Sequence, residues 1–150
     1  MDVVLRGRTV QLHYEVEGHG PAAMITFHGF GQSGDDMTPV AAHFSDSHTT
    51  YHLNIFYHGR SFWDHELEML EPKDWSLVMK SLFQREGIRR FSIAAFSMGG
   101  KFALATIKAF AERINEVYLI APDGIRTSPW YSLATYPFLF QQYFRSMIVR

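Results

Sequence analysis

An apolar strand, a single serine and two glycines follow one another in the run Arg89-Arg90-Phe91-Ser92-Ile93-Ala94-Ala95-Phe96-Ser97-Met98-Gly99-Gly100. This order predicts a strand that ends at Phe96, a sharp turn at Ser97, and a helix that the glycines open. Such a turn lifts the serine hydroxyl clear of the sheet and points the first helix amides at the space around it. The turn also crowds its neighbours, so small residues are needed two positions away on either side, and these are Ala95 and Gly99.

A second apolar strand runs into a glycine-rich turn in Ala22-Ala23-Met24-Ile25-Thr26-Phe27-His28-Gly29-Phe30-Gly31. Strands that alternate with helices at this spacing predict an α/β fold, with an open, mostly parallel sheet and helices on both faces. In such sheets the chemistry collects beyond the carboxyl ends of the strands. His28, Ser97 and Asp123 all follow strands in this way.

Six strands and three helices are expected along the chain. The strands cover about 3–5, 9–16, 22–28, 50–56, 91–96 and 117–121, and a turn at Gly7 joins the first two. The helices cover about 35–44, 72–86 and 98–113, and Pro72 and Gly87 are suitable first-turn and stop residues for the second.

The serine turn resembles the nucleophile elbow of the α/β-hydrolase family. The family pattern is Gly-x-Ser-x-Gly, and this chain has Ala95 in place of the first glycine. The resemblance implies that Ser97 attacks the carbonyl of a substrate and that the backbone amide of Met98 helps to hold the resulting oxyanion. Gly99 would shape the turn.

The pair His28-Gly29 resembles the His-Gly pair that follows the third strand in the same family. The resemblance implies that the backbone amide of Phe30 is the second oxyanion-hole donor. It also implies that His28 and Gly29 shape the site, with His28 hydrogen-bonded within the turn rather than transferring protons.

A third likeness lies in Tyr57-His58-Gly59-Arg60-Ser61, which is similar to a Gly-His-Gly-x-Ser loop of the family with tyrosine in place of the first glycine. This loop is structural in relatives, which implies that His58 is a loop hydrogen-bonder. His58 and His65 lie seven positions apart in a loop, with no carboxylate cluster at ligand intervals, so no metal site is predicted. No metal or organic cofactor is implied, because a Ser-His-acid triad completes the chemistry.

The resembling fold has eight strands, with the catalytic acid usually after the seventh and the histidine after the last. We expect strands 1–6 only, truncated before strands 7–8, since no histidine follows His65. Residues 1–128 would then be the N-terminal part of the core, and the aromatic segment 129–150 the start of a cap (lid) region. Asp123 is an alternative acid, although Asp-Gly after a strand is more often a turn.

These features predict a serine hydrolase that acts on an ester, thioester or amide-like acyl bond of a small molecule. The base, and with it the acid, is expected beyond residue 150, so the chain alone should be inactive. The alternative is a non-catalytic ligand- or partner-binding module on the same fold. A third possibility is a relative that uses the elbow for perhydrolysis or carbon–carbon bond cleavage.

Composition narrows the partners and the compartment. The 150 residues carry a net charge of −1 with neither sign clustered, so nucleic acid is not expected as a partner. No apolar run is long enough to cross a membrane. Cysteine is absent and no leader is visible, so a cytoplasmic location is expected. The arginines at strand ends, among them Arg6 and Arg8, are interpreted as solvated, and a sheet edge left open could mediate self-association.

Overall fold

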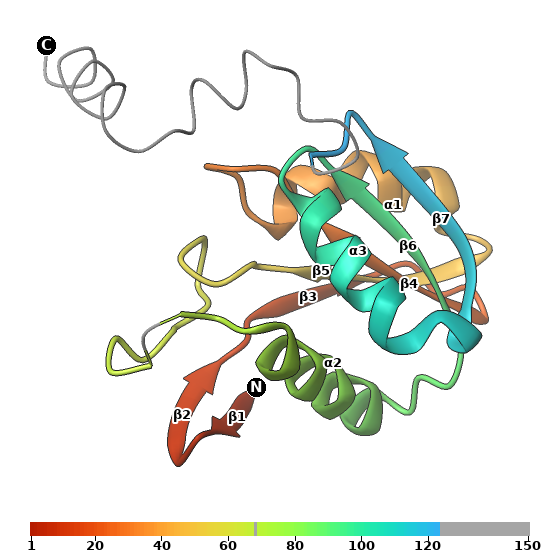
Figure 1. Cartoon of the computed structure of the whole chain (residues 1–150). Coiled ribbons are helices and arrows are strands. Elements are labelled where there is room, and N and C mark those ends of the chain that lie inside the picture. The colour runs from red at the N-terminus through yellow and green to blue at the C-terminus, as the bar shows by residue number, and fades with distance from the viewer. Residues whose placement is uncertain (68, 124–150) are drawn as a thin grey trace, which may run out of the picture.

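The structure is a computed structural model that describes residues 1–67 and 69–123 (Figure 1). A two-stranded sheet contains β1 (Asp2–Leu5) and β2 (Arg8–Gln11). A five-stranded sheet contains β3 (Tyr14–Glu17), β4 (Ala22–Phe27), β5 (His48–Leu53), β6 (Phe91–Phe96) and β7 (Ile114–Ile120). The helices are α1 (Thr38–Phe44), α2 (Pro72–Glu86) and α3 (Gly99–Phe110), with 3-10 turns at Gly34–Met37 and Ala111–Arg113.

The larger sheet has the strand order β3-β5-β4-β6-β7. Only β3 is antiparallel to its neighbour, and the other pairs are parallel. Helices α2 and α3 pack together on one face of the sheet, and α1 lies on the opposite face (Figure 1). The predicted α/β class, with a mostly parallel sheet covered on both faces, is therefore confirmed. The cap expected at 129–150 lies outside the described residues.

The single strand predicted over residues 9–16 is wrong, because the chain changes partner in its middle. β2 pairs with β1, whereas β3 pairs with β5. Between them, the Leu12 amide donates to the Met1 carbonyl, and the His13 carbonyl accepts from the Asn54 amide. Alternating polarity looks the same in one long strand and in two short ones, so the described part of the chain has seven strands rather than six.

Helix α2 begins and ends where the sequence predicts. Asp74 at its third position accepts a hydrogen bond from the amide of Glu71, the residue that precedes the helix. Gly87 ends the helix in the left-handed conformation (φ 67°). The helix face that meets the sheet is fully apolar, with Trp75, Val78, Met79, Leu82 and Phe83 all buried.

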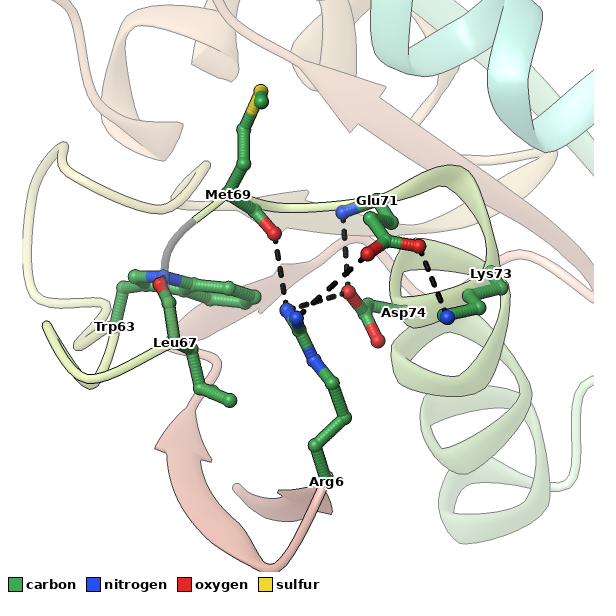
Figure 2. Close-up of polar contacts among 7 residues, drawn as sticks. All are labelled: Arg6, Trp63, Leu67, Met69, Glu71, Lys73 and Asp74. Carbon is green, nitrogen blue, oxygen red and sulfur yellow. Dashed lines mark hydrogen bonds and ion pairs between the residues drawn. The ribbon is translucent and has the colours of Figure 1, made fainter.

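Arg6 is exposed in part, as the sequence suggested, and it also has a structural role that the sequence did not indicate. It occupies the tight turn between β1 and β2 with φ 51°, and its Nη2 lies 2.9 Å from Asp74 Oδ2 and 3.0 Å from the Met69 carbonyl oxygen (Figure 2). The Asp74 side chain is only 2% exposed, whereas that of Arg6 is 34% exposed. The guanidinium therefore neutralises a buried carboxylate and joins the small sheet to the start of α2.

The hydrophobic core lies between the larger sheet and the pair α2–α3. Rings from the strands meet rings from the helix: Phe27 and Trp75 are 5.9 Å apart between centroids, and Phe83 and Phe91 are 4.5 Å apart. Such aromatic contacts pack the helices against the strands. None of the described helices combines the length and the apolar character needed to cross a bilayer.

Candidate active site

Ser97 lies at the junction of β6 and α3, in the left-handed backbone conformation with φ 48°. Its amide donates a 3.0 Å hydrogen bond to the Ile120 carbonyl. Its own carbonyl accepts 2.9 Å hydrogen bonds from the amides of Gly100 and Asp123. The predicted strand–turn–helix is confirmed, and the turn is held from both sides, so a conformation that costs roughly 1–2 kcal/mol in a residue with a Cβ is maintained.

Gly99 brings the start of α3 against the end of β4. A Cβ atom on Gly99 would lie 2.3 Å from the Phe27 carbonyl oxygen and 2.8 Å from that of His28. Both obstacles are backbone atoms that cannot rotate away. The approach therefore requires glycine here, and it places the serine turn directly beside the His28-Gly29 turn.

The turn after β4 is closed by its own residues. The Gly29 amide donates to Gln32 Oε1 at 2.8 Å, and the Gln32 amide returns a 3.3 Å hydrogen bond to the Gly29 carbonyl. Phe30 lies at the tip and is 81% exposed. Within residues 1–67 and 69–123, neither the Phe30 amide nor the Met98 amide donates to another residue. Both predicted oxyanion-hole donors are thus available to an external acceptor.

His28 is fully buried, and both of its ring nitrogens are occupied. Nδ1 donates to the Gly29 carbonyl at 2.7 Å, and Nε2 accepts from the Ile55 amide at 3.0 Å. Burial lowers the pKa of His28, and because Nε2 accepts from an amide N–H, the ring proton lies on Nδ1. These contacts connect the turn after β4 to the chain after β5, which supports the site-shaping role implied by the resemblance.

His58 lies nearer to the candidate site than its loop position suggested. Its ring is 5.3 Å from the ring of His28 and 5.5 Å from that of Phe30, edge-on in both cases. Its Nδ1 donates to the Phe56 carbonyl at 3.2 Å. His65 is exposed on another part of the loop. The described residues contain no group of three or more side chains able to hold a metal ion.

Asp123 contacts Ser97 only through its backbone. Its carboxylate has no hydrogen-bond partner among the described residues, and its amide makes the bond to the Ser97 carbonyl. Its role as a catalytic acid stays a prediction.

An apolar cavity of about 340 Å³ opens beside the serine turn, and sequence reasoning missed it. It lies between the first turns of α2 and α3 and the loop that connects β5 to α2. Its walls are Phe56, Tyr57, Met69, Leu70, Glu71, Pro72, Trp75, Lys101, Phe102 and Ala105. These residues come from three separate stretches of the sequence, so no local sequence pattern predicts the cavity.

The sequence matches no protein-family model and no curated protein. Solved structures match well. A probable hydrolytic enzyme from Pseudomonas aeruginosa is 16% identical with a TM-score of 0.76, and the match covers 89% of this chain and 43% of that one. The carboxylesterase CesB from Bacillus subtilis is 23% identical with a TM-score of 0.70, covering 89% and 47%.

A third structure, of an enzyme that degrades N-acyl homoserine lactones, is 17% identical with a TM-score of 0.72. That match covers 99% of this chain and 54% of the other. The chain thus spans about half the length of the structures it resembles. At these identities the likeness concerns the path of the backbone alone. The chain has the α/β-hydrolase fold, over about half of the length that this fold occupies in its structural neighbours.

Proposed function

We propose that Ser97 is the nucleophile of a serine hydrolase that cleaves an ester, thioester or amide-like acyl bond. The observation that carries the proposal is the left-handed Ser97 between β6 and α3, with Gly99 packed on the end of β4. A serine in this position projects its hydroxyl beyond the carboxyl ends of the strands, where substrates bind in open α/β sheets.

The two available amides give the proposal its chemistry. As Ser97 attacks, the carbonyl oxygen of the substrate becomes negatively charged, and the amides of Phe30 and Met98 would donate to it. The Gly29–Gln32 hydrogen bonds and the start of α3 fix both donors in advance, so they need no reorganisation. Each donor in such a hole contributes about 2.7–4 kcal/mol to lowering the barrier in comparable hydrolases.

The proton of Ser97 needs an acceptor, and we place it on a histidine beyond residue 150. His28 is unsuited, because Nδ1 and Nε2 both have partners and breaking either bond would open the turn. The acid that orients the base would lie beyond residue 150 as well, with Asp123 as the alternative. The nucleophile and the oxyanion donors come from the described chain.

The test uses a fluorophosphonate, which bonds covalently to an activated serine. In the protein expressed from its complete reading frame, we expect labelling at Ser97 and its loss in Ser97→Ala. Labelling at another residue, or none under conditions where the protein is folded, would refute the proposal.

A second measurement concerns residues 1–150 alone. We expect negligible hydrolysis of 4-nitrophenyl esters, with no change in His58→Ala or His65→Ala. Hydrolysis that disappears in both Ser97→Ala and one of these histidine variants would show that the chain carries its own base, and the proposed location of the base would be wrong.

A further inference from the structure

The cavity beside the serine turn has the properties of a ligand site. Two buried rings, Phe56 and Trp75, form its base and meet edge-on with centroids 6.5 Å apart. Phe102 of α3 continues the wall, 5.0 Å from the ring of Trp75. The indole N–H of Trp75 already donates to Thr106 Oγ1 at 2.9 Å, so this wall offers no unsatisfied polar atom to the cavity.

Large side chains at the entrance of the cavity are exposed, whereas side chains that only stabilise a core are buried. Tyr57 is 61% exposed and Met69 is 74% exposed, although both line the cavity. Tyr57 is also held at φ 69°, a conformation that a residue with a side chain seldom adopts. A strained, exposed aromatic residue at the entrance of an apolar cavity is characteristic of binding sites rather than of cores.

The position of the cavity relates it to Ser97. Phe102 lies in the first turns of the helix that begins two residues after Ser97. Tyr57 precedes His58, whose ring packs on Phe30 at the proposed oxyanion hole. The lining of the cavity therefore belongs to the same two segments, α3 and the loop after β5, that follow Ser97 and carry His58, and this proximity along the chain is the basis for placing the cavity and Ser97 in one substrate site.

The size of the cavity limits what it can hold. An enclosed apolar cavity of roughly 150 Å³ accommodates one benzene ring. At about 340 Å³, this cavity has room for a bicyclic aromatic group or an alkyl chain of similar volume. Edge-on ring walls favour a flat aromatic ligand, because ring contacts add to simple burial.

We infer that this cavity binds an apolar, bicyclic-sized aromatic group of the ester substrate, so that the hydrolase selects aryl esters over short aliphatic ones. The inference rests on the proposed function for its link to Ser97. The binding of the aromatic group itself does not depend on catalysis, and the two parts are tested separately.

The binding experiment uses 2-naphthol, an alcohol without a cleavable acyl bond, titrated into the 150-residue chain by calorimetry. We expect saturable one-site binding, unchanged in Ser97→Ala because the serine is not in the cavity. Ala105→Phe places a ring inside the cavity and should weaken binding at least tenfold. The matched control is Ala109→Phe, one turn further along α3, where the residue lines a different groove, and binding should be unchanged.

Two results would overturn the binding site. One is an absence of saturable binding in the unaltered chain, and the other is equal weakening by both phenylalanine variants. If Ala105→Phe fails to fold, as judged by its melting curve, Met69→Lys takes its place. Met69 is exposed, so that variant should fold, and its ammonium group at the entrance should weaken binding by a similar factor.

The link to catalysis is tested in the protein from the complete reading frame, by comparing kcat/KM for 2-naphthyl acetate and ethyl acetate. We expect Ala105→Phe to lower the ratio at least tenfold and Ala109→Phe to leave it unchanged. Naphthol binding with an unchanged ratio would refute the selection of aryl esters. If the protein binds naphthol but hydrolyses neither ester, the proposed function is refuted and the binding site remains supported.

Discussion

The backbone amide of Asp123 donates a 2.9 Å hydrogen bond to the carbonyl oxygen of Ser97. Asp123, three residues after the end of β7, thereby fastens the turn after β6. Ala121, two residues earlier, is itself left-handed with φ 44°, so the chain turns sharply to make this contact. The sequence singled out Asp123 for its carboxylate, whereas the observed contribution comes from its main chain.

The first prediction follows from that contact. Asp123→Asn keeps the backbone amide and removes only the charge, so Ser97 labelling by a fluorophosphonate should stay within about twofold of the unaltered protein. Removal of a true triad acid lowers rates by about four orders of magnitude in serine proteases. A loss of labelling approaching that size would identify Asp123 as the acid and show that the main-chain role is insufficient.

The second prediction concerns the close approach at Gly99. Gly99→Ala would place a Cβ atom 2.3 Å from the Phe27 carbonyl oxygen, and the backbone would have to move. We expect a loss of stability of about 1–3 kcal/mol, together with loss of Ser97 labelling in protein that remains folded. Gly31→Ala is the control. No atom lies within 4 Å of the Cβ position on Gly31, but its φ of 74° is left-handed, so the alanine should cost roughly 1–2 kcal/mol of backbone strain. Its Ser97 labelling should persist, and equal loss of labelling in both variants would contradict the steric account.

The third prediction compares two arginines of the β1–β2 hairpin. Arg6→Met leaves the buried Asp74 carboxylate without its cation, so chemical denaturation should show a loss of about 2 kcal/mol. Arg8→Met removes an ion pair with Glu66 between two exposed side chains and should change stability by at most about 0.5 kcal/mol. Similar losses in the two variants would mean that Asp74 does not depend on Arg6.

The fourth prediction concerns pH. Burial lowers the pKa of both His28 and His52 in the folded chain below the ordinary value of 6.5. Below pH 6.5 the unfolded chain therefore binds more protons than the folded chain, so the free energy of unfolding should fall as pH falls and recover as pH rises.

Urea denaturation at a series of pH values between 7 and 5 measures this dependence. In His28→Gln, which has no titrating ring at that position, the slope should be smaller although the variant is less stable at every pH. An unchanged slope would mean that His28 does not contribute to the dependence.

The fifth prediction concerns self-association. Among the described residues, β7 is an edge of the sheet, and Val117 and Ile120 on it are 39% and 45% exposed. We expect residues 1–150 to associate through this edge, and Val117→Lys to shift the chain toward monomer in sedimentation velocity. Val16→Lys on the opposite edge strand, β3, is the control and should not have this effect. A monomeric unaltered chain would refute the prediction.

The sequence predicted the elements that rest on local pattern. The apolar stripe of α2 and its stop at Gly87, the strand before Ser97 and the sharp turn at Ser97 all follow from hydrophobic period and glycine placement. The break between β2 and β3 could not be predicted, because it depends on which strand each half pairs with. Such pairing is decided by tertiary contacts.

The candidate site, too, was predictable only where its residues belong to local sequence motifs. Ser97, Phe30 and Met98 lie in short motifs that can be recognised one at a time. The contact of His58 with Phe30 joins different loops, and the cavity walls come from segments on either side of α2. No sequence pattern singled out Asp74, and only the fold reveals that Arg6, 68 positions earlier, neutralises it.

The pairing of β4 with β6 also bears on the order in which the molecule folds. Their register pairs Ala23 with Phe91, so the two ends of a long intervening chain segment must come together before the pair gains any stability. Gly99 can dock on the end of β4 only after that closure. The helix α2 and the β1–β2 hairpin, built from local contacts, should therefore form early, and the serine turn late. Substitutions around Ser97 should then accelerate unfolding more than they slow folding.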